Sequence, residues 1–483
     1  MKYILALDQS TSASKAFLVD EGGEILRRAS LPHRQYYPGD GLAEHDPEEI
    51  YRNVMTVLDQ AAGDTPLSEI AALAISNQRE TVVLWDRRTG KSVCPAIVWQ
   101  DVRGRDVCAR LAGQAEQILR TTGLGLSPYY PASKVAHLLE NRPDLLEMAR
   151  GGDLAMGTIE SYLIYRITGR HVTDVSNASR TQLMNLKTLA WDDDMIRIFG
   201  LERSMLAPEI LPTDGEFGFW KGVPITGVLG DSHATLFGQG CVHPGDTKVS
   251  YGTGSSVMMN MGQTPAICPD GSLTTAVAFH YGGRVHYQTE GNITCSCDTL
   301  VWLCREMAWF RDEAEIEAMA ATVPDAGGVQ LVPALSGLGA PYFDGDARGV
   351  LCGLSRGSTR AHVARAALEG IAQRCADVTE AMAAFCGSAP ALLAADGGGA
   401  KNALMMQAQA DLAGCRVRCA GHAELSALGA AYMAGLKTGL YASLEEIPAR
   451  QAAGREYVPR MAPEKREAMR RAWKLAVARA QLK

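Results

Sequence analysis

The chain has 483 residues, of which 47% are hydrophobic and 21% are charged, and its formal net charge is −7. This length exceeds one ordinary core, so we expect a globular protein of two or three domains. The acidic balance and the lack of a basic run argue against nucleic acid or an anionic membrane as partner. No window approaches the roughly 18 apolar residues of a membrane span.

The opening segment, residues 3–7, is a strand-like apolar run without the charged region, long apolar stretch and cleavage site of a leader. Twelve cysteines are scattered along the chain. The one close pair, Cys295 and Cys297, has the wrong spacing for a zinc site, and no pair of histidines is placed to complete it. We therefore expect reduced thiols and a cytoplasmic location.

Short β-type runs alternate with helical stretches, which is typical of α/β layers. The expected strands cover residues 3–7, 15–19, 24–30, 70–76, 81–85 and 95–99. Asp20–Gly23 predicts a tight turn between the second and third of these strands. The expected helices cover residues 46–60, with Asp46 as the cap and Pro47 in the first turn, and residues 101–111.

The first strand ends in Asp8, and a run of small hydroxyl residues then leads to Lys15 in the second strand. Small side chains let backbone N–H groups and hydroxyls surround phosphate oxygens, and a lysine adds a positive charge. Asp8 can hold Mg²⁺, usually through water, because that ion takes few protein carboxylates. Taken alone, this loop is equally compatible with an ordinary polar hairpin.

A second strand–turn–strand unit occurs at residues 247–259, which predicts a duplicated unit with one copy per domain. We therefore place the domains at residues 1–245 and 246–483. The turn of the second unit, Tyr251–Gly254, contains two glycines that permit close backbone approach to a ligand. A third loop, residues 396–402, has three glycines ahead of a helix, which favours a nucleotide. The spacing fits neither a Walker loop nor a Rossmann fingerprint.

Between these loops, an apolar strand ends at Gly230, and Asp231 leads into a helix. A carboxylate at such a turn is often a helix cap. In a kinase it would instead accept the proton of an attacking hydroxyl, which phosphoryl transfer requires of some residue. The local sequence alone leaves both interpretations open.

Five segments carry a family resemblance: residues 44–47 (EHDP), 75–81 (ISNQRET), 96–100 (AIVWQ), 173–181 (TDVSNASRT) and 338–342 (LGAPY). In order and spacing they resemble the glycerol kinases of the FGGY carbohydrate-kinase family, and the resemblance runs over nearly the whole chain. The second signature of that family is matched well within residues 349–369. The first is matched less completely, because His137 stands where a tryptophan is expected.

The resemblance implies an α/β fold of two actin-like (ribonuclease-H-like) domains with a cleft between them. It implies ATP-dependent phosphorylation of a hydroxyl of a small polyol or sugar, with ATP and Mg²⁺ as cofactors, by a homo-oligomer (dimer or tetramer). By position, Asp231 would be the catalytic base and Asp8 would hold the metal. The polyol would be bound by Arg79, Glu80, Trp99, Tyr129, Asp231 and Ser232. ATP would be bound by Thr11, Ser12, Lys15, Gly252, Thr253, Gly398, Gly399 and Asn402.

The chemistry of the polyol set supports that assignment. A guanidinium group beside a carboxylate can recognise two hydroxyls, because a hydroxyl can accept a hydrogen bond from the guanidinium and donate one to the carboxylate. Arg79 and Glu80 are adjacent, and in a regular strand they would face opposite sides. They can therefore serve one ligand only where the strand has ended, which is where the sequence puts them.

Two positions beside the substrate depart from the glycerol kinases. Ser232 replaces a glutamine, and Ser256 replaces a phenylalanine that packs on the carbon chain. Smaller side chains predict a larger and more polar pocket. Near the nucleotide, Cys297 and Val301 replace a glycine and a glutamine. The loop before Pro224 lacks the Gly-rich, Arg-ended segment that binds fructose bisphosphate in regulated glycerol kinases.

Three hypotheses follow. The first is phosphorylation of glycerol, and the second is a kinase for a four- or five-carbon polyol or ketose. The third is a non-catalytic, actin-like ATP-binding sensor. The sensor hypothesis is disfavoured, because the chain has all the residues that catalysis would need, namely Asp8, Asp231 and the glycine loops. A protein without activity need not keep them.

Overall fold

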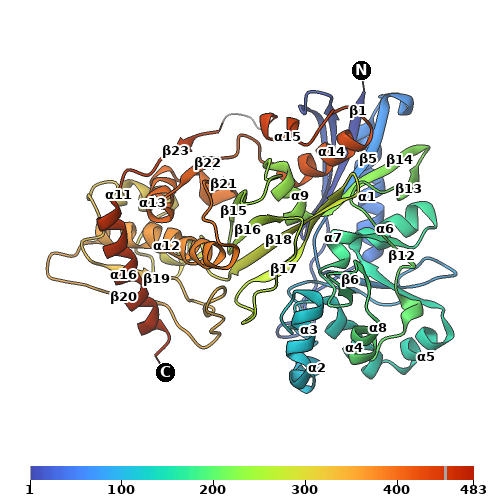
Figure 1. Cartoon of the computed structure of the whole chain (residues 1–483), viewed down its shortest axis with the longest axis horizontal. Helices are drawn as coiled ribbons and strands as arrows, with labels where there is room; N and C mark the ends of the chain where they lie inside the picture. Colours follow the sequence, from blue (N-terminus) through green and yellow to red (C-terminus); the bar gives the residue numbers. More distant parts are fainter. Residues whose placement is uncertain (1, 451–453, 483) are drawn as a thin grey trace.

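Two large mixed sheets organise the chain, shown in Figure 1 as a computed structural model that describes residues 2–450 and 454–482. The first sheet has the order β13-β14-β5-β1-β2-β3. Its strands are β1 (Tyr3–Gln9), β2 (Ala13–Asp20), β3 (Ile25–Pro32), β5 (Ile70–Asn77), β13 (Gly218–Trp220) and β14 (Val223–Gly230). The second sheet has the order β17-β18-β16-β15-β21-β22-β23. Its strands are β15 (Thr247–Tyr251), β16 (Ser255–Gly262), β17 (Thr274–Tyr281), β18 (Arg284–Ile293), β21 (Leu392–Asp396), β22 (Arg416–Cys419) and β23 (Glu456–Tyr457).

The predicted repeat is confirmed, because the two sheets share one central unit. β1 pairs antiparallel with β2 and parallel with β5. β15 pairs in the same way with β16 and β21. In register, Asp8 lies between Lys15 and Ser76, while Ser250 lies between Ser256 and Asp396. The strand ends that carry the first and second loops are therefore equivalent positions in the two sheets.

Helices cover the sheets in layers. Those of the first half are α1 (Pro47–Ala62), α2 (Arg105–Arg110), α3 (Ala115–Thr122), α4 (Pro131–Asn141), α5 (Pro143–Gly151), α6 (Ile159–Thr168), α7 (Val175–Ala178), α8 (Asp193–Ile198) and α9 (Asp231–Gly238). Those of the second half are α10 (Asp298–Arg305), α11 (Glu313–Ala320), α12 (Arg360–Cys386), α13 (Ala403–Ala413), α14 (Leu425–Lys437), α15 (Glu446–Ala449) and α16 (Pro463–Ala480). α1 and α6 pack on one face of the first sheet, and α12 and α13 pack on the second sheet.

Smaller strands complete the fold. A four-stranded sheet has the order β4-β7-β6-β8, and three two-stranded ribbons pair β9 with β12, β10 with β11 and β19 with β20. Their bounds are β4 (Glu44–His45), β6 (Val82–Asp86), β7 (Ala96–Ile97), β8 (Leu154–Thr158), β9 (Val172–Asp174), β10 (Met184–Asn185), β11 (Ala190–Trp191), β12 (Glu209–Leu211), β19 (Gln330–Val332) and β20 (Val350–Cys352). Among the residues described, no helix is long and apolar enough to cross a membrane.

α9 and α14 share a core with both sheets, and this core takes in Met258 and Ala394 of the second sheet. Figure 1 shows α14, from late in the chain, beside β1 and β5. The two helices touch backbone to backbone, because a Cβ at Gly429 would lie 1.8 Å from the carbonyl oxygen of Ala234. The large strands before residue 245 and those after it form separate sheets, while α14 crosses back to the first. The boundary at residue 245 stays a prediction.

The first three predicted strands and the first helix are confirmed, and Asp46 caps α1 by accepting from the backbone N–H of Glu48 at 2.9 Å. Two extents were wrong. The strand predicted at residues 95–99 is only Ala96–Ile97, and the helix predicted at 101–111 begins at Arg105. The reason is Asp101, whose carboxylate accepts from the backbone N–H groups of Ala43 and Arg103 and so stabilises a loop.

Candidate active site

The second and third loops meet at a cavity of about 590 Å³, a size typical of a small-ligand site. Four of the residues expected to bind ATP line it, namely Gly252, Thr253, Gly398 and Gly399. Glycine is required at Gly397, which has a φ of +87° and where a Cβ would lie 2.3 Å from the carbonyl oxygen of Tyr251. The third loop can therefore lie directly against the second.

Asn402, also expected at the nucleotide, caps the helix that follows the third loop. Its side-chain oxygen accepts from the backbone N–H of Met405 at 2.8 Å, at the start of α13. Cys297 lines the same cavity, and a Cβ at Gly399 would lie 2.5 Å from its sulfur. The structure thus places the predicted Gly-to-Cys replacement directly against the third loop.

The other residues expected at ATP, Thr11, Ser12 and Lys15, belong to the hairpin of the first sheet and do not line that cavity. The ammonium of Lys15 lies 3.2 Å from a carboxylate oxygen of Glu424, just before α14, and 3.7 Å from the carboxylate of Asp8. Sequence reasoning missed Glu424. No local signal marks it, because its partner is 409 positions away.

Asp8 is 3% exposed, and among the residues described its Oδ1 has no hydrogen-bond partner. Burial raises the pKa of Asp8 to about 6, although Lys15 lowers it. A buried carboxylate oxygen without a partner fits a cation. The described part of the chain holds no cluster of three or more His, Cys, Asp or Glu side chains placed around a metal. Mg²⁺ at Asp8 would therefore take most of its ligands from water and phosphate oxygens.

Asp231 begins α9 but is not its cap, because Gly230 holds that position and no side-chain cap bond is formed. Its Oδ1 accepts from the backbone N–H of Ser232 at 2.6 Å and lies 3.5 Å from Nε of Arg79. The carboxyl side chain is 36% exposed. Burial raises the pKa of Asp231, and Arg79 opposes that rise. The carboxylate is therefore ionisable, oriented and open to a ligand on one side.

Arg79 and Glu80 lie beyond the end of β5, as predicted, and Glu80 has a left-handed φ of 59°. The guanidinium of Arg79 forms two hydrogen bonds with the carboxylate of Glu290, at 3.0 and 2.9 Å. Nε of Arg180 donates to Glu80 at 2.6 Å, and its Nη1 lies 3.1 Å from Glu290. The four side chains form a buried network of alternating charge with no net charge.

Glu290 and Arg180 were not among the predicted site residues. Burial alone would raise the pKa of Glu290, but Arg79 and Arg180 hold it well below its usual range. The signal that would have found Glu290 is a lone acid inside a strand-forming run, since a buried charge requires a partner. Arg180 lies within the segment at residues 173–181 that carries the family resemblance.

Trp99 connects the predicted polyol residues to the first loop. Its Nε1 donates to Oγ1 of Thr11 at 3.0 Å, and its ring centroid lies 5.7 Å from that of Tyr129. The ammonium of Lys134 donates to the backbone carbonyl of Trp99 at 3.2 Å and to that of Tyr129. Burial raises the pKa of Tyr129 well above its usual range, so its phenol stays neutral. A rigid aromatic wall therefore adjoins the first loop.

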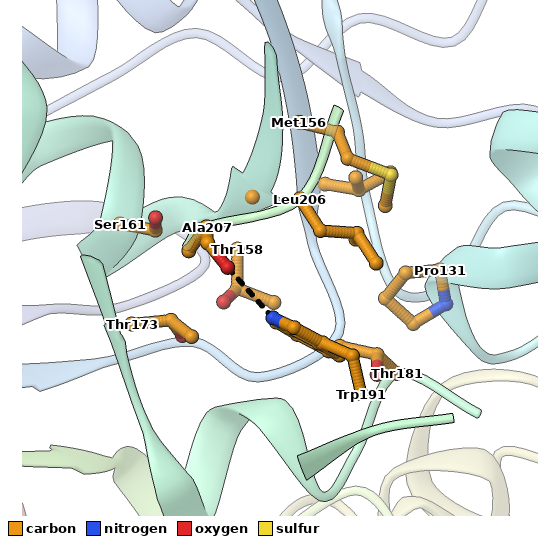
Figure 2. Close-up of a pocket in the computed structure, with 11 residues that line it drawn as sticks. Pro131, Met156, Thr158, Ser161, Thr173, Thr181, Trp191, Leu206 and Ala207 are labelled. Carbon is orange, nitrogen blue, oxygen red and sulfur yellow. Dashed lines mark hydrogen bonds between the residues drawn. The ribbon is translucent and has the colours of Figure 1, made fainter. Parts of the chain in front are cut away.

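A second cavity, shown in Figure 2, is a packing defect. It encloses about 10 Å³ among residues that include Met156, Thr158 and Trp191, room for about one water. The indole N–H of Trp191 donates to the carbonyl of Ala207 at 2.8 Å beside it. None of the predicted site residues lines this cavity.

Comparison with known proteins identifies the family. The FGGY family of carbohydrate kinases matches through its N-terminal domain at residues 3–238 and its C-terminal domain at residues 247–438. Glycerol kinase 1 of Thermotoga maritima is 42% identical, over 98% of this chain and 99% of its own. Glycerol kinase of Thermus brockianus is 43% identical, over 99% of each chain. The crystal structure of Plasmodium falciparum glycerol kinase with ADP superposes with a TM-score of 0.95 and 31% identity, covering 100% of this chain and 99% of that one.

Proposed function

The chain belongs to the FGGY family of carbohydrate kinases, and from that premise we propose that it transfers the γ-phosphoryl group of ATP to a hydroxyl of glycerol. The observation that carries the proposal is the position of Asp231. This carboxylate is 36% exposed, lies 3.5 Å from Arg79 and does not cap its helix. The names of the full-length relatives at 42% and 43% identity support glycerol as the acceptor.

On the acceptor side, Asp231 accepts the proton of the attacking hydroxyl as the oxygen bonds to phosphorus. Arg79 and Glu80 hydrogen-bond neighbouring hydroxyls, because one donates and the other accepts. Glu290 holds the guanidinium plane, so Arg79 presents its remaining N–H groups in a fixed direction. Trp99 and Tyr129 cover the carbon chain, and Ser232 lies beside the base.

On the donor side, the backbone of Gly252, Thr253, Gly398 and Gly399 supports the nucleotide at the large cavity. Thr11, Ser12 and Lys15 approach the phosphates from the hairpin of the first sheet. Lys15 exchanges its contact with Glu424 for phosphate oxygens when the nucleotide binds. Mg²⁺ held near Asp8 would neutralise the charge of the phosphates during transfer.

A second acceptor class has one observation in its favour. Ser256, which stands where glycerol kinases carry phenylalanine, donates to Oε1 of Glu290 at 3.1 Å. The position is thus polar and small, which favours a four- or five-carbon polyol or ketose over the three carbons of glycerol. A cytoplasmic location and a homo-oligomer, dimer or tetramer, also belong to the proposal.

The test is an ADP-release assay coupled to NADH oxidation, with glycerol, erythritol, xylitol, xylulose and ribulose as acceptors. We expect acceptor-dependent turnover that requires Mg²⁺. ATP binding with no ADP release for any acceptor would overturn the kinase proposal and favour the non-catalytic sensor. Turnover with a pentose but not with glycerol would replace the acceptor and leave the reaction class intact.

A further inference from the structure

A cluster of four buried polar side chains adjoins the strand ends that carry the site, and the mechanism above uses none of them. They are Asn77 at the end of β5, and Asp174, Ser176 and Asn177 around the start of α7. All four residues are 0% exposed. Burying polar groups is costly unless each finds a partner, so the hydrogen bonds of such a cluster determine its geometry.

Asp174 fixes the side chains of α7 in one orientation. Its carboxylate accepts from the backbone N–H groups of Ser176 and Asn177, at 2.8 and 3.0 Å. It also accepts from the hydroxyl of Ser176 at 3.1 Å and from the side-chain amide of Asn177 at 2.6 Å. Because the hydroxyl proton of Ser176 is donated to Asp174, the lone pairs of that oxygen are left for another donor.

That donor belongs to the strand that ends at the proposed base. The hydroxyl oxygen of Ser176 accepts from the backbone N–H of Gly230 at 3.1 Å, and Gly230 ends β14 directly before Asp231. Asn177 and Asn77 exchange two amide hydrogen bonds, both of 2.9 Å. The register of the sheet places Asn77 beside Gly230. α7 therefore holds the ends of both strands, β14 and β5, from which the base and the predicted polyol residues emerge.

The other end of α7 is held by the second sheet. Ser179, which directly follows α7, donates from its hydroxyl to the backbone carbonyl of Ser176 at 2.7 Å. The same hydroxyl accepts from the backbone N–H of Val277 in β17 at 3.2 Å. The short helix thus bridges the two large sheets, and its hydrogen bonds at both ends oppose a shift of Ser176 relative to either sheet.

The base has little freedom to move without losing its geometry. A Cβ at Gly230 would lie 2.6 Å from Cγ of Arg79, so the backbone before the base packs directly on that side chain. Oδ1 of Asp231 lies 3.5 Å from Nε of Arg79. A general base must lie within hydrogen-bond reach of the proton it accepts, and a misplacement of about 1 Å can lower a rate by about 100-fold. The hydrogen bond from Gly230 to Ser176 fixes the backbone one residue ahead of this contact.

Resting on the proposed kinase function, we propose that Ser176 is a positioning residue of phosphoryl transfer, which holds Asp231 beside Arg79 through the backbone N–H of Gly230. Ser176 is fully buried and does not line the nucleotide cavity, so it acts on the rate through the base. Without its hydroxyl, the base moves relative to the attacking hydroxyl, while ATP still binds to the loops of the second sheet. The loss therefore falls on transfer and not on nucleotide binding.

The test is Ser176→Ala, which removes the hydroxyl at nearly constant size. We expect kcat to fall by about 10–100-fold and the KM for ATP to stay within about two-fold. Thr122→Val is the matched control, because Thr122 on α3 is also buried and its hydroxyl also accepts from a backbone N–H, that of Leu124 at 3.2 Å. This control should leave kcat unchanged.

A second measurement repeats Ser176→Ala in an Asp231→Asn enzyme, in which no base remains to be positioned. There we expect Ser176→Ala to change the residual kcat by less than about two-fold, because the effects of residues that act as a unit are not additive. A role confined to packing would lower kcat by the same factor in both backgrounds.

A Ser176→Ala enzyme with the parental kcat would overturn the inference and leave the proposed function standing. An equal fall of kcat in the two backgrounds, or the same fall for Thr122→Val, would also overturn it. An Asp231→Asn enzyme with the parental kcat would overturn it as well, because Ser176 would then have no base to position. If the parent turns over no acceptor, the proposed function itself fails, and the inference fails with it.

Discussion

Glu290 on β18 and Arg79 after β5 form a two-point ion pair, with N–O distances of 3.0 and 2.9 Å. The pair joins a strand of the second sheet to the loop that ends a strand of the first. Both side chains are buried, and Arg79 also lies 3.5 Å from Asp231. The direction in which Arg79 meets a substrate therefore depends on a residue from the other half of the chain.

We expect Glu290→Gln to raise the KM for the polyol by about 10-fold and to lower the unfolding free energy by about 3 kcal/mol. The amide keeps the shape of the side chain but removes its charge. The buried guanidinium groups of Arg79 and Arg180 then share only the carboxylate of Glu80. Acceptor titrations and thermal unfolding measure the two effects. Glu116→Gln, in an exposed pair with Arg120, is the control and should change neither. An unchanged KM would show that Arg79 does not depend on Glu290 for its orientation.

Asp231→Asn removes the proton acceptor at nearly constant size. We expect kcat to fall by about 10²–10⁴-fold, the range typical of a lost general base. ATP affinity should stay within about two-fold, because the nucleotide cavity is lined by other residues. The coupled ADP-release assay measures kcat, and a nucleotide-binding titration measures the affinity for ATP. A variant that turns over at the parental rate would remove Asp231 from the mechanism.

Asp8→Ala tests the metal assignment. The variant loses the buried carboxylate whose Oδ1 has no hydrogen-bond partner within the described part of the chain, so the Mg²⁺ concentration for half-maximal rate should rise by about 10-fold or more. Polyol affinity, measured by calorimetry without nucleotide, should not change. Glu21→Ala, which removes an exposed carboxylate in the turn between β2 and β3, serves as the control for the metal dependence. Matching Mg²⁺ curves for the parent and Asp8→Ala would show that Asp8 does not hold the ion.

The features that the sequence predicted well are local ones. The hairpin from Asp8 to Lys15, the cap at Asp46 and the turns at Gly252 and Gly397 each depend on residues that are close along the chain. The partner of Arg79 could not be predicted in this way, since Glu290 lies 211 positions away and the pair exists only when both sheets are assembled. The roles of the site residues carried over by resemblance stay predictions.

Glu160 makes stability depend on pH. It is fully buried. Burial is the main reason why its pKa is raised to about 7, and repulsion from Asp174 adds to the rise. The hydroxyls of Thr173 and Thr158 donate to its carboxylate and partly oppose this rise. The folded state binds more protons at this group than the unfolded state does between its ordinary value of 4.5 and about 7. The unfolding free energy therefore falls as pH rises through that window.

Glu160→Gln should remove this dependence. Relative to the parent, the variant should gain about 1–3 kcal/mol at pH 8 and little at pH 4.5, since the glutamine is neutral at both. Thermal unfolding at the two pH values measures the difference. Glu116→Gln, on an exposed helix face, should show no such difference. Equal Tm changes at both pH values would mean that Glu160 is already ionised in the folded protein at low pH.

We expect the preferred acceptor size to depend on Ser256, whose hydroxyl donates to Oε1 of Glu290 at 3.1 Å. Where the resemblance to glycerol kinases predicts a phenylalanine, this chain has a serine that donates a hydrogen bond to the carboxylate paired with Arg79. If the space beside Ser256 is open, glycerol leaves it unfilled, and each missing methylene-sized contact lowers kcat/KM by about 10–200-fold.

The double variant Ser256→Phe with Ser232→Gln should consequently raise kcat/KM for glycerol relative to four- and five-carbon acceptors by about 10-fold or more, because the ring would occupy the position of their extra carbons. Ser256→Ala is the control: it removes the hydrogen bond to Glu290 without filling the space, so it should not favour glycerol. Competition assays with glycerol and each longer acceptor measure the ratio directly. An unmodified protein that already prefers glycerol over every longer acceptor would contradict this prediction and support glycerol as the proposed acceptor, since other side chains would then fill the space beside Ser256.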